Sequence, residues 1–174
     1  KKPEDKMQIC SFLWIYYGFP ASSYEGINVE VMRNVSGEYL ARADMKRMGK
    51  SRGELPFDLI AGIPDSGIAH AIGYVNESGI REARPFVKYT PSWPRSFMPT
   101  EQNLRDLVAR KKLVPIEQLI RGMKILSCED SIVRGTQLKD FIRMLFSEYG
   151  AEEVHMRPAC PPLTQGCKYL NFSR

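Results

Sequence analysis

The sequence predicts an α/β protein whose mostly parallel sheet is flanked by helices. Two short apolar segments with the character of buried strands, residues 57–63 and 123–128, alternate with segments whose apolar residues recur at helical spacing. A polar turn follows each of these strands and opens a helix. Strands that alternate with helices in this way are typical of parallel sheets, in which ligands bind at the carboxyl ends of the strands.

The size and composition are those of one globular domain, residues 1–174. The chain is 43% hydrophobic and 26% charged, and no apolar run approaches the ~20 residues that a membrane span needs. The net charge of +5 is spread along the chain, so we expect a small phosphorylated ligand and no nucleic acid. Four cysteines without a Cys-x-x-Cys pair indicate a reducing, cytoplasmic setting. Because the sequence opens on Lys1 without a signal segment, we expect a piece of a longer chain.

The first half predicts a helix on each side of the first turn. Apolar residues recur at near-helical spacing in residues 26–43, which predicts an amphipathic helix, and a charged stretch at 46–54 ends it. Its predicted apolar face consists of Ile27, Val31, Val35, Tyr39 and Leu40. The strand at 57–63 then leads through the turn into a helix of small residues, 68–76.

The second half predicts strands at 86–88 and 154–158, with a long loop after the first of them. This loop, residues 89–102, contains three prolines and is long enough to be functional.

Two helices are also predicted there. Pro115 is expected to start a short helix that ends at Arg121, and Gly150 is expected to close a longer one. The apolar stripe of the longer helix consists of Leu138, Phe141, Ile142, Leu145, Phe146 and Tyr149.

The turn after the second buried strand has residues suited to a sugar phosphate. The carboxylates of Glu129 and Asp130 can accept hydrogen bonds from vicinal ribose hydroxyls or help to hold Mg²⁺. The N–H groups of residues 131–137, with the positive end of the next helix, can surround a phosphate. Gly135 permits a left-handed turn or close approach of that phosphate. On the residues alone, an ordinary helix cap at Asp130 or Ser131 is an alternative.

Residues 129–136, Glu-Asp-Ser-Ile-Val-Arg-Gly-Thr, resemble the signature with which type I phosphoribosyltransferases bind phosphoribosyl pyrophosphate (PRPP). Among these enzymes, the sequence of this segment is most similar to that of the amidophosphoribosyltransferases. Segments 10–17 and 150–157 are similar to the same family, so the resemblance covers nearly the whole chain and implies the type I phosphoribosyltransferase fold. The residues that it assigns to ribose and 5′-phosphate are Glu129, Asp130, Ser131, Ile132, Val133, Arg134, Gly135, Thr136 and Gln137.

The chain departs from the family signature at two positions. Glu129 and Gln137 stand where the family usually has aspartate and threonine. Both changes keep a polar side chain, although the longer Glu129 alters how hydroxyls or a metal would be held.

The turn after the first strand resembles the pyrophosphate loop of this family. Residues 88–102 resemble its flexible loop, which closes over PRPP. The residues that the resemblance assigns to pyrophosphate are Asp65, Ser66, Gly67, Lys88 and Arg95.

The resemblance also implies the roles of single residues. Arg95 and Asp130 are expected to be catalytic. The expected Mg²⁺ ligands are Ser66, Glu129 and Asp130. Some family members hold a [4Fe-4S] cluster, and Cys10 and Cys167 match two of its four cysteines.

By this resemblance the chain is expected to form 5-phosphoribosylamine from PRPP and ammonia with release of pyrophosphate, the first step of purine biosynthesis. In the family the ammonia comes from glutamine through a glutaminase domain, which these residues do not contain. Purine nucleotides are expected as inhibitors, and the protein is expected to be a homo-oligomer without a membrane partner. The alternatives are a PRPP-binding regulatory domain without turnover and a purine or pyrimidine salvage phosphoribosyltransferase.

Overall fold

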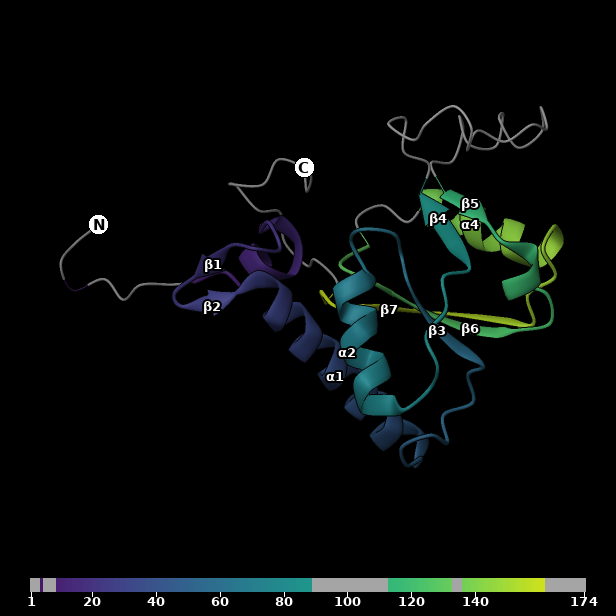
Figure 1. Ribbon diagram of the computed structural model, residues 1–174, viewed down its shortest axis with the longest axis horizontal. Helices are drawn as coiled ribbons and strands as arrows, with labels where there is room; N and C mark the ends of the chain where they lie inside the picture. Colours follow the sequence, from purple (N-terminus) through teal and green to yellow (C-terminus); the bar gives the residue numbers. More distant parts are fainter. Residues whose placement is uncertain (1–3, 5–8, 89–112, 133–135, 162–174) are drawn as a thin grey trace.

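The structure, a computed structural model, describes residues 4, 9–88, 113–132 and 136–161. Figure 1 shows a sheet with helices α1 and α2 on one side and α4 on the other. The described chain begins with a short π-helical turn, η1 (Leu13–Tyr17), and a small hairpin of β1 (Ser23–Tyr24) and β2 (Ile27–Asn28). Within the described residues, no helix has the length and apolar character that crossing a membrane requires.

The central sheet has three parallel strands, as the sequence predicts. β3 (Leu59–Gly62) pairs with β6 (Lys124–Glu129), which pairs in turn with β7 (Glu153–Pro158). The register places Gly62 opposite Cys128. Because the strands are parallel, their carboxyl ends lie at one edge of the sheet, and the two predicted turns leave the sheet side by side.

Alternate side chains of the strands enter two apolar cores, one on each face of the sheet. Leu59 and Ala61 lie in the core that contains residues of α4 (Thr136–Ser147). Ile60, between them, lies in the core that contains residues of α2 (Ile68–Ser78). Successive side chains of a strand point to opposite faces of the sheet. Because both faces of this sheet are covered, the predicted strands are continuously apolar.

A second sheet of two strands corrects one predicted helix. β4 (Phe86–Lys88) runs antiparallel to β5 (Leu113–Pro115), and Phe86 pairs with Pro115. Pro115 therefore ends a strand, and only Glu117–Leu119 (η3) forms a turn of 3-10 helix. Proline lacks an N–H and is tolerated both at a strand end and at a helix start, so its presence alone does not distinguish them.

The longer helix of the second half is confirmed as α4. Phe141 and Leu145 of its predicted stripe are buried, together with Met144. Phe146 is the exception, because it lies beyond the edge of the buried face and is 44% exposed. The helical period was therefore predicted correctly, whereas the width of the buried face was overestimated.

The helix predicted at residues 26–43 is α1 (Val29–Met48). The side chain of Asn28 caps it by accepting a hydrogen bond of 3.1 Å from the N–H of Val31. It ends at Gly49, whose backbone is left-handed with φ 61°. The charged stretch at 46–54 was expected to end the helix, but Lys46 and its neighbour extend the last turn, where positive charge is favourable.

The prediction of which face of α1 is buried is wrong. The apolar side chains expected to face the core include four that are exposed: Ile27, Val31, Val35 and Tyr39. The residues that α1 buries are instead Val29, Arg33, Gly37, Ala41 and Asp44.

Small residues at the helix contact explain the reversed face. A Cβ atom added to Gly37 of α1 would lie 1.9 Å from the carbonyl oxygen of His70 in α2. In return, a Cβ atom added to Gly73 of α2 would lie 1.8 Å from the carbonyl oxygen of Asn34. The two helix backbones therefore touch, and no larger apolar side chain fits between them.

A buried ionic network explains how Asp44 can face inward. Its carboxylate accepts hydrogen bonds from the hydroxyl of Tyr74 (2.8 Å), the guanidinium of Arg157 (2.6 Å) and the guanidinium of Arg47 (2.7 Å). These partners come from α2, β7 and α1 itself, so a single carboxylate ties both helices to the edge of the sheet. Polar pairing replaces apolar burial at this point.

We predict that Gly37→Ala destabilises the protein, although alanine is the better helix former. Helix propensity alone predicts a gain of about 1 kcal/mol, but the new methyl group meets the backbone of α2. We expect a net loss of about 2 kcal/mol or more, as for overpacked sites, in the free energy of unfolding measured in urea.

Ala43→Gly is the matched control, because this position of α1 is exposed. It should cost only the propensity difference of about 1 kcal/mol. A Gly37→Ala protein more stable than the wild type would show that the helices do not touch here.

Candidate functional site at the edge of the sheet

The turns after β3 and β6 pack against each other at the carboxyl edge of the sheet. The N–H of Ile63 donates a 3.0 Å hydrogen bond to the carbonyl of Cys128. A Cβ atom added to Gly67 would lie 2.0 Å from the same carbonyl oxygen. A side chain at position 67 would therefore push the turns apart, so glycine is what allows them to share one site.

The first turn presents a carboxylate and a hydroxyl from a strained backbone. Asp65 has a left-handed backbone with φ 70°, which is uncommon for a residue with a side chain. Its carboxylate forms an ion pair with the ammonium group of Lys88, at the end of β4. Both side chains are exposed, so the pair adds little stability and leaves both groups accessible.

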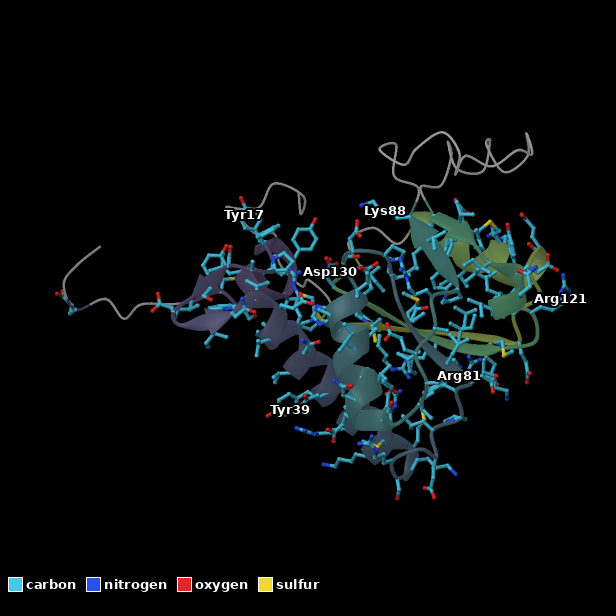
Figure 2. The ribbon with its side chains drawn as sticks, in the orientation of Figure 1. Tyr17, Tyr39, Arg81, Lys88, Arg121 and Asp130 are labelled. Atoms are coloured by element: carbon cyan, nitrogen blue, oxygen red, sulfur yellow. The ribbon has the colours of Figure 1, made fainter. Side chains whose placement is uncertain are left out.

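The second turn holds two adjacent carboxyl groups in a fixed backbone. The carboxylate of Glu129 accepts a 2.9 Å hydrogen bond from the N–H of Asp130, and the hydroxyl of Ser131 donates one of 2.9 Å to the carboxylate of Asp130. The chain after β7 fixes the backbone, because the N–H groups of Ala159 and Cys160 donate to the carbonyls of Glu129 and Asp130. Figure 2 labels Asp130 and Lys88 at this end of the sheet.

Burial makes both carboxyl groups harder to ionise. It raises the pKa of Glu129 to about 7, against which hydrogen bonds from the Ser66 side chain and the Asp130 N–H act. Burial also raises the pKa of Asp130, while its bond to Ser131 and the charge of Arg33 act in the opposite direction. Ser66 on the first turn lowers the pKa of Glu129 on the second, so the side chains of Ser66, Glu129, Asp130 and Ser131 form one polar cluster with the charge of Arg33 beside it.

Arg33 is a part of the site that the sequence reasoning missed. Its guanidinium is buried and donates to the carbonyls of Trp14 (2.8 Å), Tyr16 (3.3 Å) and Gly18 (3.0 Å). It thus holds η1 against α1 while its charge stabilises the ionised form of Asp130. Nothing in the local sequence distinguishes it from a solvated helix arginine.

The described residues include only part of the predicted site. Ile132 is 42% exposed beside the acidic pair, and Thr136 opens α4 with Gln137 behind it. Five other predicted site residues lie outside the described residues: Arg95, Val133, Arg134, Gly135 and Cys167. Cys10 is exposed, and its predicted role as a cluster ligand stays a prediction.

The donor set at the two turns fits a hard divalent cation. Carboxylate oxygens of Glu129 and Asp130 and the hydroxyl of Ser66 are ligands of the kind that Mg²⁺ prefers. Two desolvated neighbouring carboxyl groups with raised pKa values also favour the arrival of a cation. Within the described residues, no three His, Cys, Asp or Glu side chains are grouped closely enough to hold a metal by themselves. A cation here would therefore complete its coordination with water or with oxygens of a bound ligand.

We predict that Glu129 makes the stability of the protein fall as the pH rises towards 8. Its pKa is about 7 in the folded protein and about 4.5 in the unfolded chain, so the stability it contributes is present in full below pH 4.5 and is lost as the pH rises through 7. In Glu129→Gln, which stays neutral, this loss should disappear, and by pH 8 the variant should gain at most about 3 kcal/mol over the wild type.

The measurement is the free energy of unfolding in urea at pH 5, 6, 7 and 8. Glu82→Gln, an exposed carboxyl outside the turns, is the matched control and should not reproduce the pH-dependent gain. A constant difference between Glu129→Gln and the wild type across this range would rule out the raised pKa.

Comparison with known proteins finds similarity to one group of enzymes. No protein-family model matches the chain. Curated relatives named amidophosphoribosyltransferase match it from Glycine max (35% identical over 96% of the chain), Methanocaldococcus jannaschii (34% over 92%) and Archaeoglobus fulgidus (33% over 95%). The chain covers 27%, 32% and 34% of these proteins, so it spans about a third of their length.

Two solved structures of related enzymes are also similar to this chain. One is the glutamine PRPP amidotransferase from B. subtilis complexed with ADP and GMP, with a TM-score of 0.76 and 32% identity over 99% of this chain and 35% of that one. Another is an allosteric regulatory enzyme of purine biosynthesis, with a TM-score of 0.71 and 34% identity over 91% of this chain and 32% of that one. The chain is thus a homologue of the amidophosphoribosyltransferases, and it has the type I phosphoribosyltransferase fold of the part of them that it matches.

Proposed function

We propose that this chain binds PRPP where the two turns meet and transfers its phosphoribosyl group to ammonia, as the transferase part of an amidophosphoribosyltransferase. The observation that carries the proposal is the contact between the turn of Ser66 and Gly67 and the acidic turn of Glu129 and Asp130. One turn is suited to pyrophosphate and the other to ribose and its 5′-phosphate, and PRPP carries these groups on one sugar.

The acidic turn would bind the ribose. The carboxylates of Glu129 and Asp130 have accepting oxygens for the vicinal hydroxyls. Because both are largely buried, such hydrogen bonds would form with little competition from water. The N–H groups of residues 131–137 would hold the 5′-phosphate at the start of α4, where the helix dipole favours an anion.

The first turn would bind the pyrophosphate. Lys88 already lies against Asp65, so an incoming pyrophosphate would exchange a solvated ion pair for a doubly charged partner of the ammonium group. Gly67 lets this turn lie directly against the carbonyl of Cys128, while its own N–H donates to the carbonyl of Ile63. Arg95, from the predicted flexible loop, would add a second positive charge.

Ser66, Glu129 and Asp130 would hold Mg²⁺ together with oxygens of PRPP. When bound, Mg²⁺ would neutralise negative charge on the departing pyrophosphate. The positive charge of the bound Mg²⁺ would also favour the ionised form of Glu129.

The transfer itself asks little covalent chemistry of the protein. The lone pair of ammonia attacks the anomeric carbon, the bond from that carbon to the pyrophosphate oxygen breaks, and the ammonium product loses a proton to water. The turns hold the sugar at both ends so that the anomeric carbon is exposed to the amine, and exclusion of water limits the competing hydrolysis.

Several properties of the whole protein belong to the same proposal. Glutamine would supply the ammonia through a glutaminase domain, and purine nucleotides would inhibit; the B. subtilis relative was solved with ADP and GMP. A [4Fe-4S] cluster on Cys10 and Cys167, a cytoplasmic location and a homo-oligomeric state remain expectations of the resemblance.

We predict that Asp130→Asn lowers kcat/KM for PRPP by about 100-fold, because the variant loses a charged acceptor worth roughly 3 kcal/mol. The assay is formation of phosphoribosylamine from ammonia, PRPP and Mg²⁺, so that no glutaminase activity is needed.

Asp140→Asn is the matched control, since Asp140 is exposed on α4 and pairs only with Arg143 among the described residues. It should leave kcat/KM unchanged. If the wild type binds PRPP with Asp130-dependent affinity but forms no amine, the regulatory alternative is correct. If it binds no PRPP, the proposed site is wrong.

We also predict that Lys88→Gln raises the Kd for PRPP by about 10-fold, with a smaller effect on ribose 5-phosphate, which has no pyrophosphate for the ammonium group to contact. Calorimetric titration of both ligands gives the comparison. Lys50→Gln, an exposed lysine beyond the end of α1, is the control. If Lys88→Gln weakened the binding of both ligands equally, Lys88 would not be a pyrophosphate contact.

A further inference from the structure

The ion pair between Asp44 and Arg157 joins α1 to β7, the last strand of the central sheet. Nε of Arg157 donates a 2.6 Å hydrogen bond to the carboxylate of Asp44, and its Nη1 donates one of 2.9 Å to the carbonyl of Met156. The side chain of Asp44 is 4% exposed and that of Arg157 is 17% exposed. The guanidinium is therefore fixed at two points and largely shielded from water.

The strand β7 connects this ion pair to the acidic turn. Arg157 lies opposite Cys128 in the register of β7 with β6, one position before the acidic turn begins. The N–H groups that follow the strand, at residues 159–160, donate hydrogen bonds of 2.8 and 2.9 Å to the carbonyls of Glu129 and Asp130. The backbone of the acidic turn therefore depends on where the end of β7 lies.

The ion pair also lies close to the end of β6. Burial raises the pKa of the Cys128 thiol to about 12, and the charges of Arg157 and Asp44 act on that pKa in opposite directions. The strand that leads into the acidic turn therefore packs against the pair on one side, while β7 carries the pair on the other.

Stability alone is a weak reason for a buried ion pair. Removing two charges from water costs free energy that their attraction largely offsets, and apolar side chains of the same volume often serve as well. A buried pair does impose one geometry, because each charge needs its partner at hydrogen-bonding distance. The carboxylate of Asp44 is also held by Tyr74 and Arg47. Asp44 is thus a fixed point to which the end of β7 is tied.

We propose that Asp44 and Arg157 are positioning residues of the candidate site, whose ion pair holds the end of β7 where it supports the acidic turn. This role rests on the proposed function, which assigns ribose and its 5′-phosphate to that turn. The pair reaches the acidic turn through β7, whereas the first turn leaves β3 and is held by the carbonyl of Cys128. Loss of the pair therefore weakens the contacts to ribose and its phosphate and spares the contacts to pyrophosphate.

Asp44→Asn tests this role, because it keeps the shape of the side chain and removes its charge. In calorimetric titrations, the Kd for ribose 5-phosphate should rise by about 10-fold, since small displacements of binding groups are costly. The Kd for pyrophosphate should be unchanged. In the amine-forming assay, the KM for PRPP should rise while kcat changes little.

Gly37→Ala is the control for lost stability, since it disturbs the contact of α1 with α2 and leaves the ion pair in place. It should change neither Kd. Circular dichroism and urea unfolding show whether each variant is folded. Arg157→Lys keeps the positive charge without the planar fork. It should therefore weaken ribose 5-phosphate less than Asp44→Asn does, and it supplies the test where Asp44→Asn fails to fold.

A double-mutant cycle tests whether the two residues act as a pair. Arg157→Met alone should weaken the binding of ribose 5-phosphate, as Asp44→Asn does. The variant with both changes should bind ribose 5-phosphate no more weakly than the weaker single variant, because the same interaction is lost in each. Effects that simply add would show that the residues act independently and would overturn the role of the pair.

Two further results would overturn the positioning role and leave the proposed function intact. One is an equal loss of affinity for ribose 5-phosphate and pyrophosphate in Asp44→Asn, and the other is the same selective loss in Gly37→Ala. A wild type that binds neither of these ligands nor PRPP would instead overturn the proposed function, and the positioning role with it.

Discussion

The close approach of Gly67 to the carbonyl of Cys128 is the contact on which the rest of the site depends. Parallel pairing of β3 with β6 brings two strand ends to one edge, but strand pairing alone would leave their turns a side chain apart. With no Cβ atom between them, the turns touch, and Ser66 lies close enough to Glu129 to lower its pKa. A ligand with an anionic group at each end of a sugar can then contact both turns at once.

Holding two carboxyl groups side by side away from water costs free energy, and the structure offsets only part of it. Backbone and hydroxyl donors reach Glu129 and Asp130, and the charge of Arg33 acts on Asp130. What remains appears as raised pKa values. A bound cation and ribose hydroxyls would remove this remaining cost, so the same burial that costs free energy would also strengthen ligand binding.

The side of the molecule formed by α1 and α2 follows a different rule from the sheet. Gly37 and Gly73 let two helix backbones touch, and Asp44 and Arg33 are buried with partners that satisfy them. Close packing and polar pairing therefore determine which residues of α1 and α2 are buried. On the two faces of the sheet, burial of apolar area determines this. The apolar residues of α1 are left outside as a consequence.

The sequence by itself determined the alternation of strands and helices, the buried face of α4 apart from Phe146, and the two turns that carry the polar residues. These features depend on local period and on residue chemistry, which neighbours in the chain already contain. The tertiary structure alone decided that Pro115 ends a strand, that Arg33 lies beside the acidic pair, and that α1 buries Gly37 instead of Val35. In each case the deciding contact joins residues distant in sequence, and hydrophobic period cannot report a partner that is a glycine, a backbone carbonyl or an opposite charge.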